Sequence, residues 1–184
     1  MSLVKATELE RIDPFAIQPT KAEEVDTTLE EMWRSGRRSR EDRLCVLRSA
    51  DGVHVDALRR FAKRVSWRLP GARIEDANLG SIVQHSSHAT CRPIVVVRTD
   101  AHCTAKSVLT AASQALGTHP SMSIAETCTR VQEVAEQQQT RIIVFHNLPH
   151  NFGGEFVAHV LWRLRKGGLH IVCILQETAR NQPR

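Results

Sequence analysis

The sequence predicts an α/β protein in which helices cover both faces of a parallel sheet, in three layers. Four short runs rich in Val, Ile and Leu alternate with amphipathic segments of helical period, and this order favours right-handed crossovers between parallel strands. Hydrophobic residues make up 41% of the 184 residues, which is enough for a buried core without disulfide bonds. Because the chain shows neither an apolar run of roughly 20 residues nor an apolar leader, we expect a cytoplasmic protein without membrane contact.

The first part of the chain divides into a tail, a helix and a connector. Residues 1–20 are expected to be extended, because two prolines interrupt them, and a single domain is expected over residues 21–184. Apolar side chains at helical spacing predict a helix over Lys21–Trp33. A polar, basic connector follows over residues 35–42, and the apolar run Leu44–Leu47 then predicts a short buried strand.

The middle of the chain alternates between the two kinds of element. Asp56–Leu69 is predicted to be an amphipathic helix that a Pro-Gly pair ends. Residues 72–91 are polar, rich in Ser and His and without a pattern, so we expect a long loop there. Pro93–Arg98 reads as a strand buried on both faces, and Thr104–Leu116 as a helix closed by Gly117.

The last part of the chain repeats this alternation. Hydrophobic periodicity predicts helices over Ile124–Gln138 and Asn151–Lys166. Apolar runs predict strands over Arg141–Phe145 and His170–Leu175. The chain then has four predicted strands, each followed or preceded by a helix, as the α/β class requires.

Charge is distributed unevenly along the chain. Residues 34–73 hold 12 basic and 4 acidic side chains, whereas residues 1–33 hold 3 basic and 8 acidic ones. A positive block suits phosphate groups, although the same residues could form a solvated helix face that packs against the acidic N-terminal segment. The candidate DNA-binding residues on the predicted helix are Arg59, Arg60, Lys63, Arg64 and Arg68. We count no aromatic residues interleaved with these cations, and therefore expect contacts to phosphates rather than stacking on bases.

Cysteine and histidine give no strong metal signal. The chain has five cysteines, and their spacing indicates no disulfide framework. His85, His88 and Cys91, with His102 and Cys103 nearby, could hold zinc if the loop and the strand end converged. Their spacing matches no standard zinc module, so no metal site is expected.

One segment carries a family resemblance. Arg43–Phe61 (RLCVLRSADGVHVDALRRF) has the strand, turn and helix frame of a phosphate-binding loop. It resembles the TniB family of AAA+ transposition ATPases, which includes TnsC-like proteins, and its LRRF matches the end of that family's motif without a gap. Further segments resemble the family's later strands and helices, so that the similarity covers roughly residues 22–178: Pro93–Arg98, Arg141–His150 and Glu155–Ile174. The resemblance implies a P-loop NTPase core of AAA+ type.

In the loop, the departures from the family motif fall on the positions that bind phosphate and metal. Arg48 replaces the first loop glycine, and Gly52 stands one place before the last one. His54 replaces the lysine and Val55 the Ser or Thr. His54 is shorter than lysine and mostly neutral at pH 7, and Val55 cannot supply an oxygen ligand to Mg²⁺.

The later strands show the same loss. His146 stands at the position of the metal-binding Asp, and Asn147 at that of the catalytic Glu. The polar sensor pair of the family falls near Leu175 and Gln176. Without a carboxylate for Mg²⁺ or a base to orient water, we expect no ATP hydrolysis, no cofactor and no ATP or Mg²⁺ binding. The helical lid of the family is expected to be missing or truncated.

The resemblance implies a catalytically inactive adaptor or regulator in DNA transposition or a related mobile-element system. Its expected partners are a transposase, a target-selection protein or an active AAA+ relative, with double-stranded DNA and self-assembly as further candidates. Because the family's rings encircle DNA, Thr104 and Lys106 would lie on the pore side. Two alternatives remain open: an active ATP-binding regulator whose metal is held by Asp51, Asp56 or Asp100, and a small non-specific DNA-binding protein.

Overall fold

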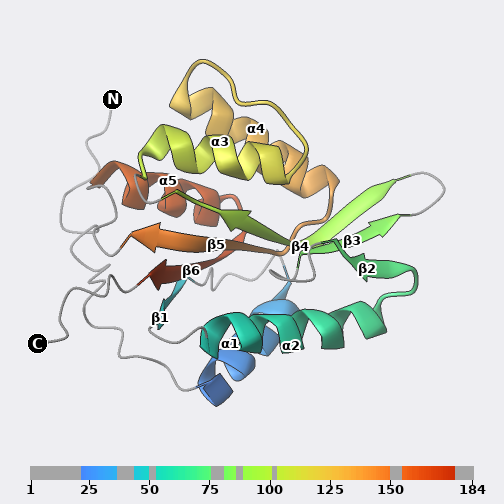
Figure 1. Ribbon diagram of the computed structural model, residues 1–184. Coiled ribbons are helices and arrows are strands. Elements are labelled where there is room, and N and C mark those ends of the chain that lie inside the picture. The colour runs from blue at the N-terminus through green and yellow to red at the C-terminus, as the bar shows by residue number, and fades with distance from the viewer. Residues whose placement is uncertain are drawn as a thin grey trace, which may run out of the picture.

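A sheet covered by helices on both faces forms the fold (Figure 1). The computed structural model describes residues 22–36, 44–49, 53–75, 81–85, 89–100, 103–149 and 155–176. The helices are α1 (Ala22–Ser35), α2 (Val53–Arg68), α3 (Ala105–Ala115), α4 (Ile124–Gln137) and α5 (Glu155–Lys166). The strands are β1 (Leu44–Ser49), β2 (Ala72–Ile74), β3 (Ile82–His85), β4 (Thr90–Arg98), β5 (Ile142–Pro149) and β6 (His170–Gln176). The predicted α/β class is confirmed.

The sheet is mixed, so the expectation of a purely parallel sheet is wrong. Its six strands lie in the order β1-β6-β5-β4-β3-β2. The four predicted strands, now β1, β6, β5 and β4, are parallel to one another. Strand β3 runs antiparallel to β4, and β2 antiparallel to β3. Antiparallel neighbours need only short connections and no crossover helix.

The expected long loop over residues 72–91 is also wrong. This stretch contains β2, β3 and the beginning of β4. Strands of three and four residues are too short to show an alternating pattern, and in β3 the consecutive residues Ile82 and Val83 are both buried. The pairing of β3 with β4 also shifts register between Ile82 and Gln84, which removes the period that a sequence would show.

The parallel strands are buried on both faces and separate two apolar cores. In β5, Ile143 and Phe145 pack among α3, α4 and α5, whereas Ile142 and Val144 pack among α1 and α2. Strands β4 and β6 alternate in the same way, as expected for a sheet with helices on each face. Figure 1 shows these two helical layers on opposite sides of the sheet.

The predicted helices are confirmed with small shifts of their ends. Helix α2 begins three residues before the expected Asp56, and its predicted apolar residues Leu58, Phe61 and Val65 are fully buried. Helix α3 starts after Thr104 and is followed by Gly117 with φ 73, the left-handed backbone that favours glycine after a helix.

Some expectations fall on residues that the structure does not describe. These are the extended tail over residues 1–20, most of the connector, and any lid beyond residue 176. Among the helices that are described, none combines the length and the hydropathy needed to cross a membrane.

Candidate functional site

The segment that resembles a phosphate-binding loop contains a strand followed by a helix in the structure. Strand β1 ends at Ser49, and α2 begins at Val53, so that His54 and Val55 lie in the first turn of α2. Gly52 falls in the turn, outside the described residues. The strand and the helix on either side of the turn are therefore as predicted, whereas the turn itself lies outside the described residues.

The register brings the other substituted positions to one edge of the sheet. Arg48 in β1 pairs with Leu175 in β6, and His146 in β5 pairs with Ile174. Gln176 lies two residues after Ile174 in β6 and pairs with Ser49 at the end of β1. All three strands are parallel, so these positions share the carboxyl edge, which is where open α/β sheets bind ligands.

The connections at this edge leave the sheet on opposite sides. From β1 the chain passes to α2 on one face, and from β5 it passes to α5 on the other (Figure 1). In open α/β sheets, ligands bind outside the carboxyl ends of the strands, where connections leave on opposite faces.

His146 is a half-buried imidazole at this edge. Its Nδ1 is buried and has no hydrogen-bond partner in the described part of the chain. Burial, with a smaller effect of the positive charge of Arg98, lowers the pKa of His146 below its ordinary value. Its carbonyl accepts hydrogen bonds from the amide and the hydroxyl of Thr99, both at 2.9 Å. A neutral imidazole cannot replace the metal-binding carboxylate of an ATPase.

Asn147 lies at an irregularity in β5. The pairing of β5 with β6 shifts between His146 and Leu148, so one extra residue is inserted in β5. Asn147 has φ 68, in the left-handed region that Asn adopts more readily than most residues. The local backbone therefore gives a structural reason for Asn at this position.

Two of the three carboxylates considered for a rearranged metal site, Asp56 and Asp100, lie in the described part of the chain. Asp56 is exposed and forms an ion pair with Arg59 at 3.0 Å. Asp100 is exposed at the end of β4, and Asp51 lies outside the described residues. Within the described ranges, no group of three or more His, Cys, Asp or Glu side chains could hold a metal ion.

The cysteine and histidine set considered for zinc is divided. His85 pairs with Thr90, and Cys91 pairs with Gln84, so His85 and Cys91 lie on opposite faces of the hairpin. Cys103 is buried, its thiol donates to the carbonyl of Asp100 at 2.9 Å, and burial raises its pKa. His88 and His102 fall outside the described residues.

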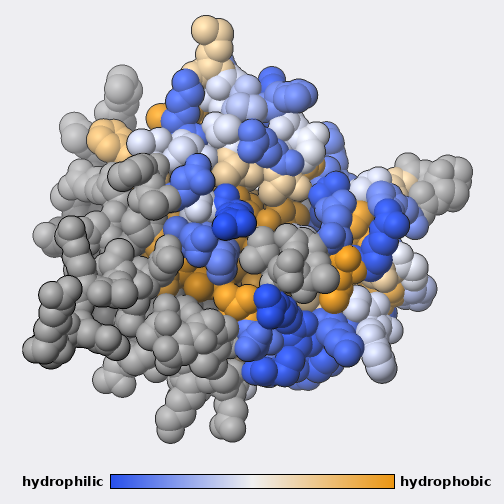
Figure 2. Space-filling view, viewed as in Figure 1, coloured by the Kyte–Doolittle hydropathy of each residue, from blue (hydrophilic) through white to orange (hydrophobic). Residues whose placement is uncertain are grey.

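The five predicted cations of α2 are all exposed, as expected from the sequence. Two of them also contact α1: Arg64 pairs with Asp26 at 3.4 Å, and Arg68 with Glu30 at 2.6 Å. The hydrogen bond from Arg68 lowers the pKa of Glu30 despite the opposing effect of burial. For this pair of arginines, packing against the acidic segment is confirmed. The surface over α2 is strongly hydrophilic in Figure 2.

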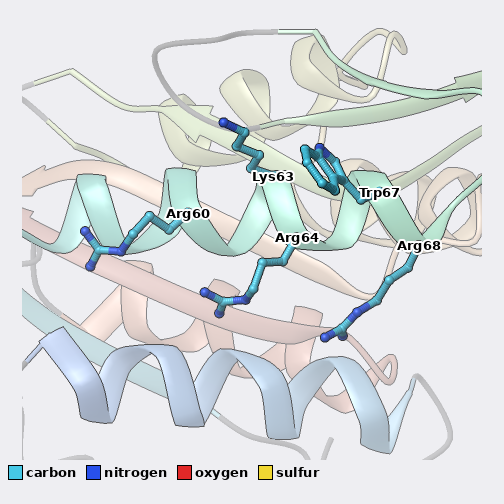
Figure 3. A pocket seen from close by; sticks show the side chains of 5 residues that line it. All are labelled: Arg60, Lys63, Arg64, Trp67 and Arg68. Carbon is cyan, nitrogen blue, oxygen red and sulfur yellow. The ribbon is translucent and has the colours of Figure 1, made fainter.

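A hollow of about 510 Å³ lies on the outer side of α2. We call it the α2 surface, and its described lining residues are Arg60, Lys63, Arg64, Trp67 and Arg68. Figure 3 shows the three arginines pointing toward α1, with Lys63 and Trp67 pointing away from it. Trp67 is 82% exposed, so the expectation that no aromatic residue is interleaved with these cations is wrong.

The sequence carried a signal for Trp67 that the prediction missed. Trp67 follows Lys63 by four positions and directly precedes Arg68, and its helical position is opposite the apolar residues Leu58 and Val65. A tryptophan on the polar side of an amphipathic helix is exposed, because the apolar side faces the core.

Thr104 and Lys106 are not part of the α2 surface. Thr104 is the N-cap of α3, and its hydroxyl accepts from the amide of Ser107 at 3.1 Å. Lys106 is exposed in the first turn of α3. Helix α3 covers the opposite face of the sheet from α2 (Figure 1), so these two groups of candidate residues form separate surfaces.

The comparisons with known proteins add no relative. The sequence matches no protein-family model, and no curated protein gives a significant match.

Proposed function

We propose that the protein is a catalytically inactive adaptor with a P-loop ATPase type of core, acting in DNA transposition or a related mobile-element system. The observation that carries this proposal is the shared edge of β1, β5 and β6. The residues at the strand positions of this edge are Arg48, His146, Asn147 and Gln176, and none of them is one of the carboxylates that an ATPase needs for Mg²⁺ and for water.

Electrostatics supports the loss of hydrolysis. Hydrolysis of ATP requires Mg²⁺ bridging two phosphates, with a carboxylate to hold the metal and a polar group to orient water. His146 offers an imidazole whose pKa is lowered by burial, and Val55 in the first turn of α2 offers no oxygen. Nucleotide would thus meet neither the metal nor the lysine that make binding productive.

The scaffold and the α2 surface support a role in binding. A core that keeps its sheet and helices without a hydrolytic site can bridge other proteins, with no nucleotide switch to release them. The α2 surface gathers four cations, and such a surface attracts the phosphates of DNA. The proposed partners are a transposase, a target-selection protein or an active AAA+ relative, together with DNA.

The test is complex formation with and without nucleotide. The purified chain would be mixed with the transposase, the target-selection protein or the active ATPase of its own mobile element, and resolved by size-exclusion chromatography. An adaptor without a switch forms the same amount of complex with and without ATP and Mg²⁺. A complex that requires ATP, or no complex with any of the three, would contradict the proposal.

A further inference from the structure

We propose that the α2 surface binds single-stranded nucleic acid, with Trp67 stacking on a base and the surrounding cations contacting the phosphates. The proposal rests on the proposed function, which includes DNA binding, and specifies that the bound nucleic acid is single-stranded. Its starting observation is an exposed indole, 82% accessible, within a hollow whose other described lining side chains are all cations.

The lining side chains form two rows along one helix. Arg60, Arg64 and Arg68 follow one another at intervals of four residues, and Lys63 and Trp67 form a parallel pair at the same interval. In Figure 3 the arginine row points toward α1 and the row of Lys63 and Trp67 points away from it, so the two rows are adjacent strips of the outer surface of α2. The longer row covers about 12 Å along the axis, at 1.5 Å per residue. A short strand can therefore lie between a row of guanidinium groups and a row that contains an aromatic ring.

The cations remain able to bind phosphate. Arg60 and Lys63 have no ion-pair partner among the described residues. Arg64 and Arg68 pair with α1, but 41% and 50% of their side-chain surfaces stay exposed. A guanidinium has five N–H donors, so a bond to one carboxylate leaves donors for a phosphate oxygen.

Trp67 distinguishes a single strand from a duplex. In a duplex the bases are stacked on each other, so an exposed indole gains nothing beyond contact with the sugar-phosphate surface. A single strand offers free base faces, and stacking on an aromatic side chain is the usual source of its affinity, together with a basic groove. Lys63 is one helical turn from Trp67, which places an ammonium group beside the stacked nucleotide.

Two other classes of partner fit this surface less well. Arginine and tryptophan are common in protein–protein interfaces, but lysine is depleted there, and in this hollow Lys63 lies one helical turn from Trp67. A helix that lies on a membrane needs an apolar face directed outward. In α2 the apolar residues Leu58, Phe61 and Val65 are buried against the sheet, and Trp67 stands alone among charges.

The decisive experiment measures both affinity and contact. The purified chain is titrated with a mixed-sequence 20-nucleotide single strand of DNA and with the corresponding duplex, by fluorescence anisotropy. In the same titration, tryptophan emission is compared between the natural chain and Trp67→Phe. The comparison separates the signal of Trp67 from those of Trp33, which is buried, and Trp162, which lies on α5 beside Lys166. We expect at least about tenfold tighter binding of the single strand, with quenching that is absent from Trp67→Phe.

Variants separate stacking from charge. Trp67→Ala should weaken single-strand binding by about 5- to 150-fold and leave duplex binding unchanged, whereas Trp67→Phe should retain most of it. Lys63→Ala should weaken both and reduce the dependence on salt. Phe156→Ala and Arg130→Ala are the matched controls, since these exposed side chains lie in the opposite helical layer. Circular dichroism checks that each variant is folded.

Each other outcome overturns the inference. Equal or tighter binding of the duplex, with no effect of Trp67→Ala, would leave the proposed DNA binding intact and refute the stacking site. Absence of binding to either DNA would refute both. If Trp67 binds vesicles of anionic lipid and no nucleic acid, the surface is a membrane contact. If it binds the transposition partner and no nucleic acid, the surface is a protein interface.

Discussion

Asn147 stands at the position of the catalytic Glu in the resembled family, and its φ of 68 gives this identity a structural meaning. The sequence shows Asn in place of Glu and predicts the chemical consequence. It does not predict the bulge at Asn147, because the bulge depends on how β5 pairs with β6. Trp67 is the opposite case, because its helical position indicates exposure, although we expected no aromatic residue among the cations of α2. The sequence shows the identity of both residues, but it does not show that the backbone of Asn147 has a positive φ.

Backbone substitutions at Asn147 provide the test at this scale. Asn147→Gly should keep or slightly raise the free energy of unfolding, since glycine adopts positive φ freely. Asn147→Val should lower it by about 1–2 kcal/mol, because a β-branched side chain is strained in the left-handed region. Urea denaturation of the two variants measures the difference, and equal stabilities would show that the conformation does not select the residue.

The helices were predicted correctly because each is long enough to show a helical period. Strands β2 and β3 were not predicted. Helix α1 buries Val25, Leu29 and Met32, as its spacing requires. The same helix runs in the same direction as α2, with Asp26 beside Arg64 and Glu30 beside Arg68. The charge blocks indicated this attraction, but which cations pair with α1 depends on how the helices cross. Three- and four-residue strands carry too few residues for any pattern.

The ion pair between Glu30 of α1 and Arg68 of α2 makes the free energy of unfolding depend on pH in the acid range. The pKa of Glu30 is lowered in the folded chain by the hydrogen bond from Arg68, so its contribution is present above the unfolded pKa and is lost as the pH falls through the folded one. Glu30→Gln should lower the free energy of unfolding by about 0.5–1 kcal/mol at pH 7 and by less at pH 3. Urea denaturation at both pH values measures this, with Glu133→Gln on α4 as the control. The same loss at both pH values would exclude an ionic origin.

The whole molecule combines a mixed sheet, whose strands β1, β6, β5 and β4 are parallel, with a helical layer on each face. The sequence predicted the four parallel strands and the helices between them, because strands buried on both faces read as apolar runs. It did not predict that the sheet is mixed, or that Trp67 and the cations of α2 form one hollow. Those features depend on which elements become neighbours in space.

Phosphate release by the purified chain tests the central claim most directly. The chain is incubated with ATP and Mg²⁺, with and without double-stranded DNA, and inorganic phosphate is measured over time. We expect no release above that of buffer in either condition, because Val55, His146 and Asn147 provide no carboxylate to hold Mg²⁺ or to orient water. Release that disappears in the His54→Ala variant would show a working site at this edge and would contradict the account.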